Sequence, residues 1–256
     1  MSLIRFEQVS KTLGGRPVLR GLNLTIEKGE TFVLLGASGS GKSVTLKHMV
    51  RLLTPDQGRV WIGEDCVSEA RGRELERIRR RFGYLFQNAA LLQWMTVEEN
   101  VALPLLEKTT MAEAEALAEA RRRLAVLGLE DAAQKYPADL SGGMQKRVGL
   151  ARAIVMNPEI ILYDEPTSGL DPVTSRTIDR LIEDLRQRLG VTSVVVTHDL
   201  HSALAIATRI GVIHEGRIVE IAPPKEFVRS RHPIVQDFLE AQYITRRGAW
   251  EETKSS

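Results

Sequence analysis

Residues 36–43 constrain the fold of this chain more than any other part of the sequence. They read Gly-Ala-Ser-Gly-Ser-Gly-Lys-Ser and match the phosphate-binding pattern G-x-x-x-x-G-K-[ST]. The run before them, residues 31–35, is apolar like a buried strand, and apolar residues recur at helical spacing after them. Glycines let such a loop curl until its N–H groups face inward, where the positive end of the following helix also attracts phosphate. The sequence therefore predicts a strand, a phosphate-binding loop and a helix, in that order.

The motif predicts specific roles for two side chains at the end of this loop. Lys42 can reach the β- and γ-phosphates of a nucleotide, and Ser43 can offer its hydroxyl to Mg²⁺. The alternative is a Gly/Ser-rich turn that only happens to precede a helix. The strand and helix patterns on either side argue against that alternative.

Composition excludes several classes of protein. The chain has 256 residues, 43% of them hydrophobic and 27% charged, which is enough for one large α/β domain with a proper core. The net charge of +2 gives no argument for nucleic acid as a partner. One cysteine, Cys66, excludes an intrachain disulfide and suits a reducing compartment. No run approaches the roughly 20 apolar residues of a membrane span, and the start lacks a secretion signal. We expect a soluble chain, or one held at a membrane by its partners.

The strand pattern changes along the chain. Short strands predicted at 3–9, 18–26 and 58–63 are separated by turns without helices, which favours an antiparallel sheet at this end. Buried strands are then predicted at 31–35, 160–164, 192–197 and 210–213. A helix lies between the second and third of these, with Asp171 as its N-cap, Pro172 in its first turn and Gly190 at its end. Strands alternating with helices predict a mainly parallel sheet covered on both faces.

Residues 88–157 form a mostly helical insert between the phosphate-binding loop and the strand at 160–164. Thr110 and Glu113 have the spacing of a capping box, and Gly128 fits the end of that helix. A second helix is predicted to begin at Ser141 and to end near residues 157–158. We expect a single nucleotide-binding domain over residues 1–242, with its helical subdomain at about 88–157, and a polar, mobile tail over 243–256.

The second part of the predicted site is the end of the strand at 160–164. Its apolar residues lead to two carboxylates, Asp164 and Glu165, at the edge where open α/β sheets bind ligands. Asp164 is placed to hold Mg²⁺ through a water, and Glu165 to orient and polarise an attacking water. Solvated acids at a strand end would be the simpler interpretation if no phosphate-binding loop shared the sheet.

Residues 140–147, Leu-Ser-Gly-Gly-Met-Gln-Lys-Arg, resemble the signature motif of ATP-binding-cassette (ABC) ATPases. Gln87 resembles the Q-loop glutamine of that family, residues 168–171 its D-loop, and His198 its switch histidine. The motifs follow the order of the family, and the resemblance covers about residues 3–240. It implies an α/β fold: a P-loop NTPase (RecA-like) core with a mainly parallel sheet, an N-terminal antiparallel β subdomain and a helical insert subdomain.

The resemblance also implies a set of site residues and cofactors, ATP and Mg²⁺. Glu165, His198, Lys42 and Gln87 would be catalytic, and Ser43, Gln87 and Asp164 would hold the metal. The nucleotide would contact Gly36, Ala37, Ser38, Gly39, Ser40, Gly41, Lys42, Ser43, Val44, Leu13, Ser141, Gly142, Gly143 and Asp171. By itself, each of Gln87, His198 and Ser141 has a structural interpretation: a polar loop residue, a histidine at a strand end and a helix N-cap.

The signature motif implies a homodimer. In the family, the motif binds the γ-phosphate of ATP held by the opposite subunit, so two nucleotides lie at the interface. Asp171 can both cap its own helix and lie at that interface. Two positions depart from the family pattern: Leu13 stands where an aromatic residue usually stacks on adenine, and Met144 stands where glutamine is commonest. Aromatic stacking on adenine is therefore lost here.

Three stretches narrow the resemblance further. The signature variant, residues 86–105 and residues 232–239 look like the ATPase of phospholipid transporters of the lipid-asymmetry (Mla) type. This implies a separate integral-membrane permease, an MCE-domain lipid-binding partner, and a peripheral location at the cytoplasmic face of the inner membrane. Residues 91–105, with Trp94, would dock a permease helix, unless they only form the core of the insert. Alternatives are the ATPase of an amino-acid or methionine importer and, more remotely, a non-transport ABC ATPase.

Two arginine-rich segments stand out, at 71–81 and 121–123. A solvated helix face is the favoured interpretation, because acids are interspersed with the arginines of the first segment. The alternative is proximity to anionic lipid headgroups.

Overall fold

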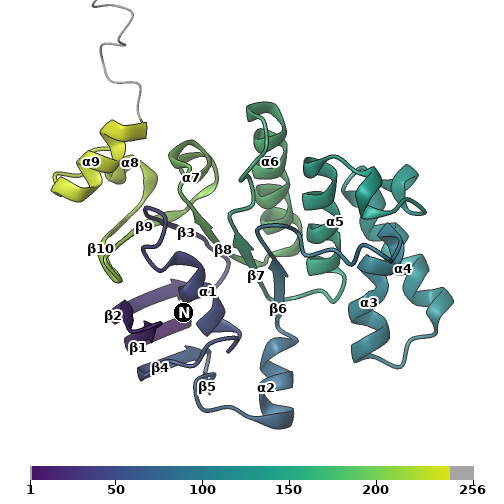
Figure 1. The fold of residues 1–256 in the computed structure, drawn as a ribbon, viewed down its shortest axis with the longest axis horizontal. Coiled ribbons are helices and arrows are strands. Elements are labelled where there is room, and N and C mark those ends of the chain that lie inside the picture. The colour runs from purple at the N-terminus through teal and green to yellow at the C-terminus, as the bar shows by residue number, and fades with distance from the viewer. Residues whose placement is uncertain (1, 243–256) are drawn as a thin grey trace, which may run out of the picture.

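The computed structural model describes residues 2–242, which form two β-sheets and a set of helices around them (Figure 1). The predicted tail at 243–256 lies outside the described residues. The strands are β1 (Ser2–Leu13), β2 (Arg16–Glu27), β3 (Thr31–Leu35), β4 (Gln57–Ile62), β5 (Asp65–Cys66), β6 (Phe82–Leu85), β7 (Ile160–Asp164), β8 (Thr192–Thr197), β9 (Arg209–His214) and β10 (Arg217–Ala222). The helices are α1 (Lys42–Met49), α2 (Gly72–Arg79), α3 (Val97–Lys108), α4 (Glu113–Val126), α5 (Gly142–Ile154), α6 (Pro172–Leu189), α7 (Leu200–Ile206), α8 (Pro224–Phe227) and α9 (Pro233–Gln242), with 3₁₀ turns η1 (Glu130–Ala132) and η2 (Pro137–Asp139).

The two sheets differ in strand direction, as the sequence predicts. The four-stranded sheet has the order β2-β1-β4-β5 and is antiparallel throughout. The six-stranded sheet has the order β10-β9-β3-β8-β7-β6; its strands are parallel except for β10, which pairs with β9 in the opposite direction. The predicted α/β fold with an N-terminal antiparallel sheet is confirmed. The carboxyl ends of β3, β7 and β8 therefore meet at one edge of the larger sheet.

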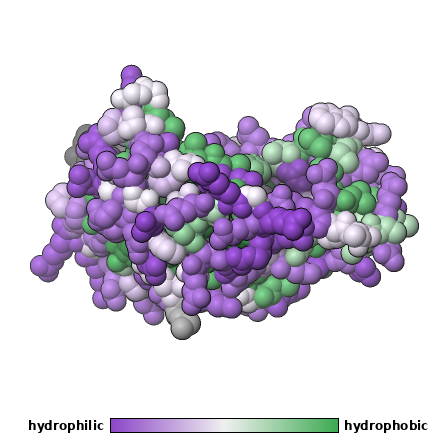
Figure 2. All heavy atoms as spheres, turned by 90° about the horizontal axis from the view of Figure 1, so that it is seen from below, coloured by the Kyte–Doolittle hydropathy of each residue, from purple (hydrophilic) through white to green (hydrophobic). Residues whose placement is uncertain are grey.

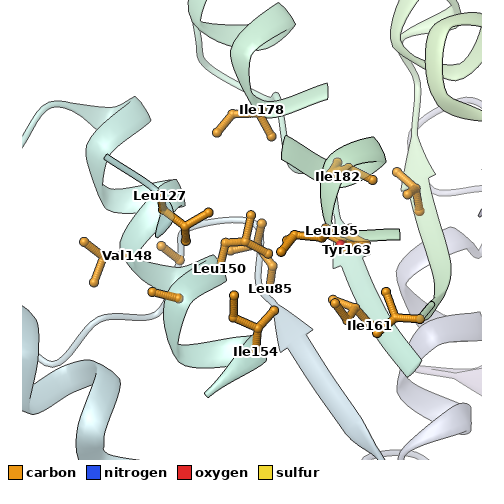
Figure 3. Packing of buried hydrophobic residues seen from close by; sticks show 14 of the residues in the cluster. Leu85, Leu127, Val148, Leu150, Ile154, Ile161, Tyr163, Ile178, Ile182 and Leu185 are labelled. Carbon is orange, nitrogen blue, oxygen red and sulfur yellow. The ribbon is translucent and has the colours of Figure 1, made fainter. Parts of the chain in front are cut away.

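The larger sheet is covered on both faces by hydrophobic clusters. Successive side chains of a strand point to opposite faces. In β3, Val33 and Leu35 join the cluster packed against α5, α6 and α7, whereas Phe32 and Leu34 join the cluster shared with α1 and the antiparallel sheet. Figure 3 shows the first cluster, where Leu150 and Ile154 of α5 approach the sheet. This packing fixes the strand ends that carry the predicted site.

The chain between β6 and β7 is mostly helical, with α3, α4, η1, η2 and α5 following one another. Helix α5 has Ser141 as its N-cap, as predicted. The predicted capping box at Thr110 and Glu113 is wrong, because α4 begins only at Glu113, after Ala112, without a side-chain cap. A capping box does occur one helix earlier, where Thr96 caps α3 and pairs with Glu99.

Helix α6 has the ends that the sequence predicts. Asp171 accepts hydrogen bonds from the backbone of Val173 and Thr174, and Gly190 adopts a left-handed conformation at the other end. An αL glycine after the last turn is a common helix stop because it carries no Cβ.

The arginine-rich segment at 71–81 lies on and beside α2. Arg77 and Arg81 pair with Asp65, and Arg81 also pairs with Glu159 at the start of β7. Figure 2 views the molecule from the side of α2, and hydrophilic residues dominate that face. The contacts agree with a salt-bridged, solvated surface. No helix among residues 2–242 has the length and apolar character needed to cross a membrane.

Candidate nucleotide-binding site

The phosphate-binding loop connects the buried end of β3 to α1, as predicted. Gly36 is closely surrounded: a Cβ there would lie 2.6 Å from the Ile213 carbonyl oxygen and 2.6 Å from Ser40 Oγ. Gly41 has a φ of +109° and stands at the N-cap of α1. A side chain at either position would be excluded by space or by backbone conformation. Residues 37–39 are exposed, so the outer surface of the loop remains accessible.

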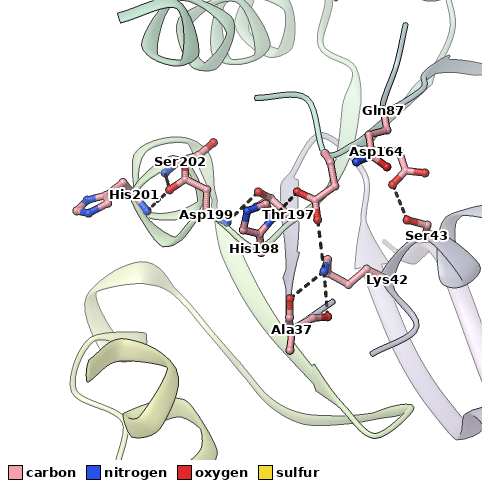
Figure 4. Close-up of polar contacts among 12 residues, drawn as sticks. Ala37, Lys42, Ser43, Gln87, Asp164, Thr197, His198, Asp199, His201 and Ser202 are labelled. Carbon is pink, nitrogen blue, oxygen red and sulfur yellow. Dashed lines mark hydrogen bonds and ion pairs between the residues drawn. The ribbon is translucent and has the colours of Figure 1, made fainter. Parts of the chain in front are cut away.

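Lys42 and Ser43, at the start of α1, point toward the ends of neighbouring strands (Figure 4). The Lys42 ammonium donates to the carbonyl oxygens of Gly36 at 2.8 Å and Ala37 at 3.2 Å, so the side chain folds back along the loop. Ser43 Oγ donates to Asp164 Oδ1 at 2.6 Å. The structure thus brings together the loop and the predicted metal-binding carboxylate at the end of β7.

Glu165 follows β7 and lies at the centre of the polar cluster. Its carboxylate is 3.3 Å from Lys42 Nζ and 2.8 Å from His198 Nδ1, which comes from the end of β8. The Glu165 side chain is largely buried, at 11% exposure, whereas His198 is 59% exposed. Glu165 also has a φ of +49°, a left-handed conformation that non-glycine residues rarely adopt. Such strain persists only where surrounding contacts hold it.

Asp164 has a second partner that the sequence analysis missed. Tyr84, in β6, donates its hydroxyl to Asp164 Oδ2 at 3.2 Å. Burial of this phenol, reinforced by the Asp164 charge, raises the pKa of Tyr84 above its usual value, so it stays protonated and able to donate. Tyr84 lies three residues before Gln87, but only the pairing of β6 with β7 brings its hydroxyl to Asp164.

Gln87 lies in the segment that follows β6, and its backbone is held by α5. Lys146 donates to the Gln87 carbonyl and, at 3.0 Å, to the Glu165 carbonyl. Just beyond, Ala89 and Ala90 both have positive φ, and Arg152 donates to their two carbonyls. The Gln87 side chain is exposed. Lys146 and Arg152 carry no sequence signal for these roles, because no local pattern distinguishes a buried cation from one on the solvated face of a helix.

The predicted signature residues lie at the start of α5, beside the start of α6. Ser141 caps α5 by accepting from the Met144 N–H, and Ser141 and Gly142 are exposed. A Cβ on Gly143 would lie 2.4 Å from the Thr174 side chain, so this glycine allows α5 to approach α6. Asp171, the N-cap of α6, is therefore in the same neighbourhood.

The two remaining predicted nucleotide contacts are Val44 and Leu13. Val44 is half-buried in the first turn of α1, and Leu13 is 37% exposed at the end of β1. A cavity of about 500 Å³ opens beside His198 and is lined also by Ser168, Gly169 and Leu170 of the predicted D-loop. The segments that follow β7 and β8 therefore line the same cavity.

The residues present fit a magnesium–nucleotide complex. Ser40 Oγ is buried in the loop and has no hydrogen-bond partner among the described residues. The hydroxyl of Ser43 and the carboxylate of Asp164 supply oxygen ligands of the kind that Mg²⁺ prefers. Over residues 2–242 there is no group of three or more His, Cys, Asp or Glu side chains able to hold a metal. Mg²⁺ is usually bound by one or two protein groups together with substrate phosphates, so this sparse set suits it.

Comparison with known proteins decides the family. The family model described as ABC transporter matches residues 19–168, which include the loop, Gln87, the signature motif and both carboxylates. The chain belongs to the ABC transporter family. It is an ATPase of the transporter type, and its two sheets match the ABC ATPase fold.

Curated relatives cover almost the whole chain. The probable ribonucleotide transport ATP-binding protein mkl of Mycobacterium tuberculosis is 39% identical over 249 residues, which are 97% of this chain and 69% of the relative. The methionine import ATP-binding protein MetN of Cereibacter sphaeroides is 43% identical over 242 residues, 92% of this chain and 68% of the relative. The names of these two relatives give different transported substrates, ribonucleotides for one and methionine for the other.

Solved structures agree with the fold. The dimeric ATP-binding cassette MJ0796 in a post-hydrolysis state, bound to ADP and Pi, has a TM-score of 0.79 and 36% identity, and the match covers 87% of this chain and 99% of that one. The cbiO1 protein of Clostridium perfringens, part of the ABC transporter complex cbiONQ, has a TM-score of 0.81 and 28% identity, with 93% and 95% covered.

Proposed function

We propose that this chain binds MgATP at the 36–43 loop and hydrolyses it with Glu165 as the general base. The observation that carries this assignment is the position of the Glu165 carboxylate, 3.3 Å from Lys42 Nζ and 2.8 Å from His198 Nδ1. A carboxylate held between two such groups, next to a phosphate-binding loop, can orient and polarise a water for attack on a phosphoryl group.

The other residues of the cluster take complementary roles. Lys42 places a positive charge where negative charge develops on the transferring phosphoryl group, and His198 donates or accepts at the same place. Ser43, Asp164 and Gln87 would hold Mg²⁺, and Tyr84 keeps Asp164 turned toward Ser43. When bound, Mg²⁺ supplies charge neutralisation at the phosphate oxygens. Leu13 and Val44 would contact the rest of the nucleotide, with apolar contact in place of aromatic stacking on adenine.

We propose further that two copies form the complete site. Of the signature residues, Ser141 and Gly142 are exposed at the N-terminus of α5, and Gly143 packs against Thr174 of α6. Helix N-termini attract anions, so they suit the γ-phosphate of a nucleotide held by a second copy. Asp171 would lie at the same interface. The dimeric state of MJ0796 supports this arrangement.

The transported substrate that we propose is phospholipid, moved by a separate integral-membrane permease with an MCE-domain partner. The resemblance of residues 86–105 and 232–239 supports it. The chain would act as a peripheral protein at the cytoplasmic face of the inner membrane. Trp94, 76% exposed seven residues after Gln87, offers an apolar contact for a permease helix, while its neighbours Leu91 and Leu105 are buried. Nucleic acid is not among the partners we propose.

A second candidate is the ATPase of a methionine-type importer. The 43% identity to a methionine import protein favours it, and the catalytic assignments would stay the same. The substrate contacts the permease rather than this chain, so partners must decide between the two candidates.

The test is affinity purification of the native protein from detergent-solubilised membranes, with mass spectrometry of proteins and lipids. Recovery with a permease, an MCE-domain protein and bound phospholipid supports the phospholipid proposal. Recovery with a permease and an amino-acid-binding protein supports the importer instead. Recovery with ribosomes or DNA and no membrane protein would contradict both.

A further inference from the structure

We propose that Lys146 is a positioning residue for ATP hydrolysis, because its ammonium group fixes the backbone of both Glu165 and Gln87 and ties them to α5. This inference rests on the proposed roles of Glu165 and Gln87. Lys146 itself contacts neither the nucleotide loop nor the carboxylate oxygens, so it acts through the two residues that it holds.

The hydrogen bonds of Lys146 matter because its charged group is buried. The residue is only 5% exposed, and a buried ammonium needs partners for its donors. Two donors go to backbone carbonyls: one to Glu165 at 3.0 Å, the other to Gln87. Burial lowers the pKa of the Lys146 amine, and the nearby charges of Glu165 and Asp164 offset only part of that effect. The side chain therefore joins three segments far apart in the sequence.

The Glu165 carbonyl is held at a strained position. With φ at +49°, this residue keeps its conformation only through its neighbours. Its N–H donates to the Val196 carbonyl at 2.9 Å, and its carbonyl accepts from the Ser168 N–H at 3.2 Å. Lys146 adds a charged donor to that carbonyl, and charge-assisted hydrogen bonds are the stronger kind. The direction of the Glu165 carboxylate, between Lys42 and His198, follows from this backbone orientation.

The backbone of the segment that contains Gln87 is also held by side chains of α5. Ala89 and Ala90 are in left-handed conformations, and Arg152 holds their carbonyls while Lys146 holds that of Gln87. The two cations of one helix thus set the path of the chain that carries the proposed metal ligand. Of the two, only Lys146 also reaches Glu165.

Helix α5 begins at the signature motif, so Lys146 lies just over one turn from Ser141. The helix rises about 1.5 Å per residue, so Ser141 and Lys146 are close along its axis and move together as one rigid unit. In a dimer, a displacement of the signature motif against the nucleotide of the other copy would therefore shift the carbonyls of Glu165 and Gln87. Lys146 would be one side chain that transmits such a displacement to Glu165 and Gln87.

Lys146→Met tests this in the purified protein, and Arg79→Met is the matched control. Arg79, at the end of α2, also donates to two backbone carbonyls, Val50 at 2.9 Å and Arg51 at 3.0 Å, neither of which belongs to the site. Steady-state hydrolysis gives kcat and KM, and thermal unfolding gives Tm for each variant.

We expect Lys146→Met to lower kcat about tenfold or more, since small misplacements of catalytic groups are costly, with KM within about threefold of wild type. Arg79→Met should keep kcat within about twofold, although it also removes a cation that holds two backbone carbonyls and can lower Tm. Lys146→Arg, which retains charge and donors, should recover about a third or more of the wild-type kcat. Wild-type kcat in a folded Lys146→Met, or an equal loss of kcat in both methionine variants, overturns the inference.

Lys146→Gln decides the question if Lys146→Met does not fold. The glutamine amide can donate to one of the two carbonyls, so we expect kcat to fall about threefold or more. Wild-type kcat in this variant overturns the inference. A wild-type protein that hydrolyses no ATP, or a fully active Glu165→Gln, would instead contradict the proposed function.

Discussion

Glu165 is held from three directions, and each contact comes from a different part of the chain. Lys42 of α1 and His198 after β8 approach its carboxylate, while Lys146 of α5 donates to its carbonyl. In the proposed chemistry, Lys42 supplies positive charge, His198 can exchange a proton, and Lys146 orients the backbone. At the scale of residues, the proposed chemistry depends on the convergence of these three groups on one strained residue.

A second residue-scale feature is Asp179, buried between α6 and α7, where it accepts a hydrogen bond from Ser202. Burial raises the pKa of Asp179 above its usual 3.8, and the charge of Asp199 adds to this effect. The folded state therefore binds the proton more tightly than the unfolded state. Its contribution to stability is fully present below the unfolded pKa and is lost as pH rises through the folded pKa.

We predict that Asp179→Asn, which keeps a hydrogen-bond acceptor and removes the charge, raises Tm by a few degrees at pH 7. The gain should shrink as the pH falls from 7 toward the raised pKa of Asp179, because the wild-type carboxyl then takes up a proton. Thermal unfolding across this pH range measures the difference. A variant less stable than wild type at neutral pH would show that the charged form of Asp179 is favoured in the folded protein.

At the scale of elements, the helix caps offer a direct comparison between two threonines. Thr96 caps α3 in a reciprocal box with Glu99, whereas Thr110 precedes a helix that begins without a side-chain cap. We predict that Thr96→Ala costs about 1 kcal/mol of unfolding free energy and that Thr110→Ala costs close to none. Denaturant unfolding measures both. Equal effects would contradict the assignment of the cap.

The long buried strands were predictable from sequence, and most helix starts in the insert were not. Residues 31–35, 160–164 and 192–197 each contain at least three consecutive apolar residues, and β3, β7 and β8 have these bounds. In the insert, two threonines each stand three residues before a glutamate, at 96 and 110, and packing rather than local pattern decides which one caps a helix. The edge strands β6 and β10 were missed, because β6 has only four residues and charged residues, Arg217 and Glu220, interrupt β10.

The candidate site also contains residues that were predictable from the sequence and residues that were not. The loop, Asp164 and Glu165 were singled out by their own patterns after buried strands, and His198 by the resemblance to the family; the strand order then brings them together. The contacts of Tyr84 and Lys146 depend on how β6 and α5 pack against β7, which is a long-range property without a local signal.

At the scale of the whole molecule, exposed Trp94 is a feature that the folded chain by itself does not explain. We predict that Trp94→Ala keeps basal ATP hydrolysis within about twofold and weakens association with the permease about tenfold, because exposed aromatic residues are frequent interface anchors. Co-purification from membranes and ATPase assays measure the two effects. Val228→Ala, also exposed and apolar but next to α8, is the matched control. Equal effects of the two variants would contradict the docking role.

The central claim is that two copies close over MgATP and that Glu165 then drives hydrolysis. The most direct test is Glu165→Gln, measured by steady-state hydrolysis and by size-exclusion chromatography with and without MgATP. We predict at least about a hundredfold loss of kcat, since general-base catalysis contributes on that order, together with ATP binding and a dimer that persists in MgATP. Hydrolysis at the wild-type rate in this variant would contradict the assignment of Glu165, and a monomer under all conditions would contradict the shared site.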